Sequence, residues 1–146
     1  YLRPNVGYRE KKSEINDKMI FGKKFMLYLN KYLCGFTCDL IPERPYLVAK
    51  HFEIMGSGSL LLACNPNTKK YFTKLGFEDM IDYVSCTPEN IKDKTKFILD
   101  ENNIDIINKI RLSGYNKVIK FHNYKIRTEY IYNIMVNNEN NISYNY

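Results

Sequence analysis

Glu53 is the residue whose setting most directly suggests chemistry. It is a carboxylate within an otherwise apolar stretch, Phe52-Glu53-Ile54-Met55. An ionised carboxylate can accept hydrogen bonds from both hydroxyls of a ribose, and acidic groups at the polar ends of α/β sheets commonly do so. A plain surface glutamate on a helix would have the same spacing. The segment by itself therefore leaves ribose binding and surface exposure both open.

Basic and amide side chains flank the same stretch. Arg44, Lys50 and His51 stand near the start of a helix expected at about residues 47–55, and Asn65 begins the turn after the next apolar run. The free amides and positive dipole of a helix N-terminus attract anions, and cationic side chains add to that attraction. These residue types are suited to holding a phosphorylated ligand.

Three short apolar runs are expected to be the strands that position these groups. They cover residues 36–40, 60–64 and about 80–85. The middle run, Leu60-Leu61-Leu62-Ala63-Cys64, is apolar at every position, which is typical of a central parallel strand covered by helices on both faces. Ligands bind such sheets at the carboxyl ends of the strands, which here means the loops after Leu40, Cys64 and Ser85.

Helical periodicity separates the predicted strands and follows the last one. Apolar residues recur every three or four positions from Phe21, again at about 47–55, around 71–75, and in three segments between Ile91 and Met135. This alternation predicts the α/β class, with a Rossmann-like parallel sheet flanked by helices and joined by right-handed crossovers.

The chain divides into one domain and two flanking segments. Residues 1–20 are expected to be a linker or entering segment, 21–136 the domain, and 137–146 a disordered tail rich in Asn and Tyr. Three strands make a small sheet. A further element within residues 1–20, strands upstream in a longer protein, or a second copy of the chain would each complete it.

Composition restricts the classes of protein that fit. The 146 residues carry 22 Lys and Arg against 16 Asp and Glu, a net charge of +6 that suits anionic partners. The basic residues are scattered in pairs, and no helix-turn-helix, RNA-recognition or zinc signature accompanies them. Nucleic-acid binding is therefore the weakest reading. No apolar run approaches the roughly 20 residues of a membrane span.

The four cysteines, Cys34, Cys38, Cys64 and Cys86, are too few and too unevenly spaced for a disulfide framework. Their spacing, and that of His51 and His122, does not fit a structural metal site, so no metal is predicted. Buried thiols in a reducing cytoplasm are the better interpretation, and the Asn, Lys, Ile and Tyr content is typical of an AT-rich genome.

Several segments, taken together in their order, resemble the C-terminal half of GT-B glycosyltransferases, and most closely the bacterial spore-maturation-type family. In that family a basic residue precedes Phe-Glu, a small-residue turn and an apolar strand follow, and a His-x-Tyr-x-x-Arg segment closes the domain. The similarity runs from about Phe25 to Met135. The segments that carry it are Lys50 to Leu62, Tyr71-Phe72, Gly76-Phe77-Glu78 and His122-Asn123-Tyr124 with Arg127.

The resemblance implies a glycosyltransferase that moves a sugar from a nucleoside-diphosphate donor to a hydroxyl of a sugar, protein or lipid acceptor. It implies that Glu53 holds the donor ribose and that Lys50 lies near the donor phosphates. Arg44, His51 and Asn65, expected at the same edge of the sheet, are the further candidates for donor binding. The resemblance also implies that Gly56 and Gly58 form the small-residue turn where the backbone approaches the donor. No resident cofactor is implied, and the acceptor half of the fold would lie outside these 146 residues. The catalytic residues are not identified.

A non-catalytic module of the same fold, which binds a nucleotide or a partner, is the main alternative. It is favoured by the missing acceptor half and by Pro45, which stands where retaining members of the fold often carry a glutamate. His122, Tyr124 and Arg127 are expected to serve packing and the helix surface rather than the ligand.

Overall fold

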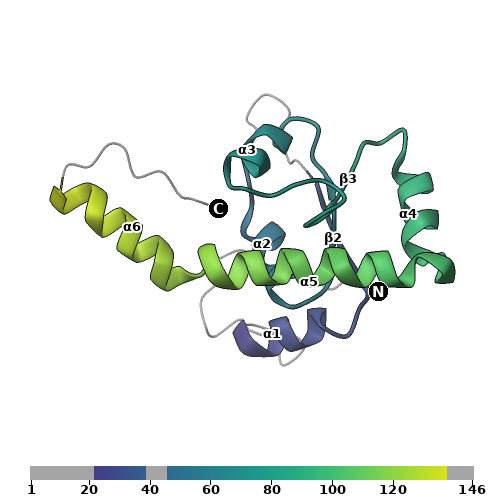
Figure 1. Ribbon diagram of the computed structural model, residues 1–146, viewed down its shortest axis with the longest axis horizontal. Coiled ribbons are helices and arrows are strands. Elements are labelled where there is room, and N and C mark those ends of the chain that lie inside the picture. The colour runs from purple at the N-terminus through teal and green to yellow at the C-terminus, as the bar shows by residue number, and fades with distance from the viewer. Residues whose placement is uncertain (1–21, 39–45, 138–146) are drawn as a thin grey trace, which may run out of the picture.

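The computed structural model describes residues 22–38 and 46–137, and all structural statements below concern these residues. Helices and strands alternate along the first two thirds of the chain, and helices alone follow (Figure 1). The elements are α1 (Gly22–Leu29), β1 (Cys34–Cys38), α2 (Ala49–Gly56), β2 (Leu60–Cys64), α3 (Lys69–Lys74), β3 (Val84–Cys86), α4 (Ile91–Leu99), the 3-10 turn η2 (Glu101–Asn103), α5 (Ile104–Phe121) and α6 (Tyr124–Asn137).

The three strands form one parallel sheet in the order β1-β2-β3. This confirms the predicted α/β class and the parallel pairing, and β2 has the predicted bounds. β1 begins two residues earlier than expected, because Gly35 lies within the strand instead of ending the preceding helix. A Cβ at Gly35 would lie 2.9 Å from the side chain of Ile54, so the glycine lets α2 pack closely on the strand. β3 is limited to three residues.

Both faces of the central strand β2 are buried, as its apolar run predicted, whereas the edge strand β1 is partly exposed. Leu61 and Ala63 face a core that also contains Phe72 of α3, and Leu60 and Leu62 face a second core with α4 and the start of α5. Leu60 and Leu61 are fully buried. Each such leucine contributes about 1.5 to 3 kcal/mol, so β2 is the main hydrophobic anchor of the domain.

The long helix α5 crosses the edge of the sheet where the strands begin (Figure 1). Arg111 of α5 donates from Nε to the carbonyl oxygen of Gly58, two residues before β2, at 2.9 Å. Asp82, which precedes β3 and is 1% exposed, accepts from Ser113 Oγ and Lys117 Nζ, both at 2.7 Å. These contacts attach α5 to the amino edge of the sheet.

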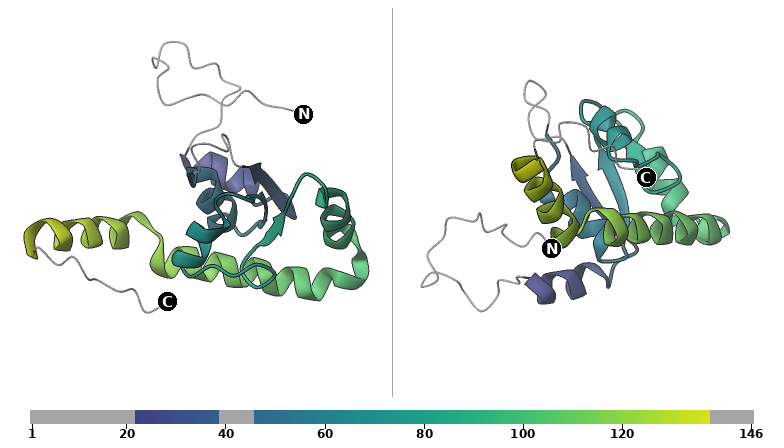
Figure 2. Two further views of the ribbon diagram at one scale, coloured as in Figure 1. Left: turned by 90° about the horizontal axis from the view of Figure 1, so that it is seen from above. Right: turned by 60° about the vertical axis from the view of Figure 1, so that its left-hand side comes forward.

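The helix α6 extends away from the sheet (Figure 2), and no residue from 124 to 136 in it is buried. Asn123 begins it by accepting from the backbone N–H groups of Lys125 and Ile126. His122, just before it, is buried and stacks on Phe77 at 4.7 Å between ring centroids. This agrees with the expected packing role of His122.

The flanking segments predicted at 1–20 and 137–146 lie outside the described residues, except Asn137, which is the last residue of α6. None of the helices in residues 22–38 and 46–137 combines the length and the apolar character needed to cross a lipid bilayer.

Candidate functional site

The carboxyl edge of the sheet is the place where the predicted ligand groups should meet. The last residues of the strands, Cys38, Cys64 and Cys86, are paired in register and mark this edge. β2 starts four residues after α2 ends, at the opposite edge, and the eight residues of α2 span about 12 Å. The first turn of α2 therefore lies toward the carboxyl edge, as a crossover helix between parallel strands requires.

Lys50 and Glu53 share one face of α2. They stand three residues apart, which places them on neighbouring turns of the helix. Lys50 is exposed and Glu53 is half-buried, whereas His51, Ile54 and Met55 are buried. The face that carries Lys50 and Glu53 is therefore turned away from the core, and both side chains are accessible to a ligand.

His51 occupies the core side of the same helix. It is fully buried, and its ring meets Phe72 edge-on at 5.2 Å between centroids. The backbone N–H of Val48 donates to Nδ1 at 3.2 Å, which closes the first turn of α2. The structure thus gives His51 a packing and capping role and places it away from the open face. Arg44, predicted beside it, lies outside the described residues.

Asn65 joins the turn after β2 to the end of β3. The residue is fully buried, and its Oδ1 accepts from Ser85 Oγ at 2.8 Å. The Asn65 side chain also lies beside the phenol of Tyr83, whose pKa is raised chiefly by burial, lowered by the neighbouring Asn65 and raised by the charges of Asp79 and Asp82. These contacts are internal, so Asn65 shapes the edge instead of presenting its amide at the surface.

A second polar link lies at the same edge. Asp79 accepts from the backbone N–H of Ser85 at 2.8 Å and forms a salt bridge with Lys69 at 2.9 Å. Because Lys69 is half-exposed, the salt bridge itself is worth at most about 1 kcal/mol. The Asp79–Ser85 bond holds the loop before β3 against the strand end.

Gly56 and Gly58 are not brought together with Lys50. They stand where α2 ends and the chain turns into β2, close to the amino edge, and Gly56 lies about 9 Å from Lys50 along the helix axis. Gly58 has φ +85°, which favours glycine, and Gly56 packs next to Val118 of α5. The predicted donor residues are therefore divided between the two edges, and the two glycines serve the turn and the helix packing.

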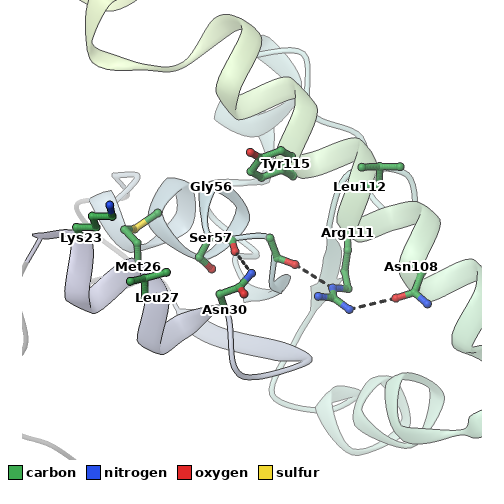
Figure 3. A pocket seen from close by; sticks show the side chains of 11 residues that line it. Lys23, Met26, Leu27, Asn30, Gly56, Ser57, Asn108, Arg111, Leu112 and Tyr115 are labelled. Atoms are coloured by element: carbon green, nitrogen blue, oxygen red, sulfur yellow. Dashed lines mark hydrogen bonds between the residues drawn. The ribbon is translucent and has the colours of Figure 1, made fainter.

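The glycines line a cavity of about 580 Å³ between α1, the α2–β2 turn and α5 (Figure 3). Arg111 reaches from α5 toward the α2–β2 turn and is held by Gly58 and by Asn108, whose Oδ1 accepts at 3.1 Å. Lys23 stands at the other side. The remaining side chains around it are Met26, Leu27, Asn30, Ser57, Leu112 and Tyr115. The lining thus contains the cations Lys23 and Arg111, several apolar side chains and no carboxylate. Such a lining suits a ligand that carries an anionic group on an apolar molecule.

Sequence reasoning missed this cavity because its residues are spread from position 23 to position 115 and are unremarkable individually. Two long-range hydrogen bonds bring them together, from Arg111 to the Gly58 carbonyl oxygen and from the Asn30 amide to the Ser57 carbonyl oxygen.

The described ranges hold no group of three or more His, Cys, Asp or Glu side chains placed to ligate a metal ion. Comparisons of the chain with protein-family models, with curated proteins and with solved structures found no match. A functional assignment therefore depends on the residues and their geometry.

Proposed function

We propose that this chain is the donor-binding half of a GT-B glycosyltransferase, which binds a nucleoside-diphosphate sugar at the carboxyl edge of its sheet. The observation that carries the proposal is the placement of α2. This helix connects two parallel strands and presents Lys50 and Glu53 together on its accessible face. The pair stands in the part of the chain that resembles the donor-binding segment of that family.

The two side chains supply complementary chemistry for such a donor. The Glu53 carboxylate can accept from both hydroxyls of the ribose, and a charged acceptor forms stronger hydrogen bonds than a neutral one. The Lys50 ammonium lies one turn nearer the helix N-terminus, where positive charge stabilises a diphosphate. The leaving diphosphate of a glycosyl transfer would gain the same stabilisation.

Calorimetric titration of the chain with UDP, GDP and their sugars tests the proposal. Glu53→Gln keeps the shape of the side chain but replaces the charged acceptor, and is expected to weaken nucleotide binding by about 1 to 3 kcal/mol. Glu101→Gln is the matched control, because Glu101 is an exposed glutamate in the turn before α5. Equal affinities of the wild type and Glu53→Gln would refute the donor site at α2.

A non-catalytic nucleotide-binding module of the same fold is the second candidate, and one observation favours it. His51 and Asn65, two polar side chains predicted near the donor, are both fully buried and engaged in internal contacts. Binding of UDP or GDP with no added affinity for the corresponding sugar nucleotides, in the same titrations, would support this alternative, because the donor-binding half by itself is also expected to show little transfer.

A further inference from the structure

Three cysteines form one row across the carboxyl end of the sheet. Cys38 is paired with Cys64, and Cys64 with Cys86, in the register of the parallel strands. Register partners in a parallel sheet project to the same face. Cys64 and Cys86 pack on the core shared with α4, so the three thiols stand side by side on that face.

The spacing of the row allows disulfides between neighbours only. Adjacent strands lie about 4.7 to 4.9 Å apart. Disulfide formation needs Cα atoms about 4.4 to 6.8 Å apart, so Cys38 can reach Cys64 and Cys64 can reach Cys86. Cys38 and Cys86 are separated by two strand spacings, about 9 to 10 Å, and cannot be bridged without backbone movement. Any bond within the row must therefore include Cys64.

Accessibility decides where an oxidant enters. Cys38 is exposed, Cys64 is half-buried and Cys86 is 2% exposed. Burial, followed by the neighbouring Cys64, raises the pKa of Cys86 to about 12, which keeps that thiol protonated and unreactive. Cys34 stands at the opposite end of β1, level with Leu60, and burial raises its pKa to about 11. Cys38 is thus the thiol of the row that solvent reaches.

We propose that peroxide converts Cys38 and Cys64 into an intrachain disulfide that joins the carboxyl ends of β1 and β2. The Cys38 sulfur attacks one peroxide oxygen, the O–O bond breaks, and a sulfenic acid and one water form. The Cys64 sulfur then attacks the Cys38 sulfur, the S–O bond breaks, and the hydroxide leaves as a second water with the Cys64 proton. The two thiols lose two electrons, and the peroxide is reduced to two waters.

This modification site does not depend on the proposed nucleotide binding. The disulfide would join the outer strand β1 to the central strand β2 at their carboxyl ends. The loops that connect the strands to the following helices begin at these ends. Cys34 is expected to remain reduced because it stands at the other end of β1, level with Leu60 and out of reach of Cys64, and Cys86 because it is only 2% exposed.

Thiol counting and peptide mapping of the 146-residue chain test the proposal. The reduced chain is treated with hydrogen peroxide, its remaining thiols are alkylated under denaturing conditions, and the unreduced digest is examined by mass spectrometry. The four thiols of the chain are expected to fall to two, with one linked peptide that contains Cys38 and Cys64. Dithiothreitol should restore all four.

Three serine variants make the result specific. Cys38→Ser and Cys64→Ser are each expected to abolish the linked peptide, whereas Cys34→Ser, the matched control on the same strand, should form it at the wild-type rate. Circular dichroism verifies that each variant is folded. A wild-type chain that keeps four thiols or oxidises Cys38 to sulfinic acid without a bond, or a bond between other cysteines or between chains, would overturn the proposal.

Discussion

Gly114 of α5 lies directly against the backbone carbonyl of Asp82, so closely that a Cβ at position 114 would collide with the oxygen. Glycine in a helix interior is unfavourable by about 0.5 to 1 kcal/mol relative to alanine. The close approach compensates for this, because it brings α5 near enough for Ser113 and Lys117 to bind the Asp82 carboxylate.

Gly114→Ala is expected to destabilise the domain by about 2 to 4 kcal/mol, although alanine is the better helix former, because helix and loop must separate. Urea unfolding measures the change. Asn116→Ala, at an exposed position of the same helix, is the control and should be neutral or slightly stabilising. A Gly114→Ala variant as stable as the control would show that the loop can move without cost.

Removing the Asp82 carboxylate should lower the free energy of unfolding more than breaking the exposed salt bridge between Lys69 and Asp79. Asp82→Ala removes the acceptor of Ser113 and of the Glu78 N–H and leaves Lys117 with the neutral Gly76 carbonyl oxygen in place of a carboxylate. It is expected to cost about 3 to 5 kcal/mol. Lys69→Ala breaks the Lys69–Asp79 pair and should cost less than about 1 kcal/mol. Both values follow from denaturant midpoints with unchanged m-values. Similar losses in the two variants would contradict the distinction drawn from burial.

His122 should make the domain sensitive to mild acid. Burial, and next the nearby Arg127, lowers the pKa of His122 from 6.5 to about 4. Between these values the unfolded chain binds a proton that the folded chain does not, so stability falls as the pH drops from about 6.5 toward 4. The full shift of the His122 pKa corresponds to a loss of roughly 3 kcal/mol in the free energy of unfolding.

The control for the acid effect is His122→Gln, which cannot titrate but keeps a donor near the carbonyl oxygen of Leu75. Thermal or urea unfolding from pH 7 to pH 4 should show a smaller loss in this variant than in the wild type. The carboxylates contribute equally to both proteins, so the difference between the two curves isolates His122. Parallel curves would argue against a depressed pKa.

The chain by itself is expected to show little or no glycosyl transfer. The acceptor half of a GT-B enzyme is not included in the proposed donor-binding domain, and a typical enzyme turns over at about 1 per second or faster. Product analysis with UDP- and GDP-sugars measures the rate. Turnover at that level would mean that the acceptor site is contained in these residues.

The sequence predicted the fold well where the pattern is strong and local. The apolar run Leu60–Cys64 identified the central strand with its correct bounds, because burial on both faces leaves no polar position. Gly35 misled the assignment of β1, since its local preference for a helix end was outweighed by its close packing with Ile54. Such packing depends on residues distant in sequence and is not visible in a local pattern.

The candidate site was predictable only in part for the same reason. Lys50 and Glu53 were predicted near the start of one helix at about residues 47–55, and both lie in α2, where their three-residue spacing puts them on neighbouring turns. The burial of His51 and Asn65 depends on Phe72, Tyr83 and Ser85, which arrive from later elements. Their residue types alone suggested that His51 and Asn65 bind a ligand. In the folded chain both side chains instead contact internal partners.

The attachment of α5 at the amino edge has a consequence for how this domain can change. The contacts that hold the helix to the sheet, through Arg111, Gly114 and Lys117, all lie where the strands begin. Loops at the opposite end can accept insertions or new side chains without disturbing them. Recombination of those loops with segments of different length is therefore a practical way to vary the proposed nucleotide-binding edge of this scaffold, much as antibody loops vary on a constant framework.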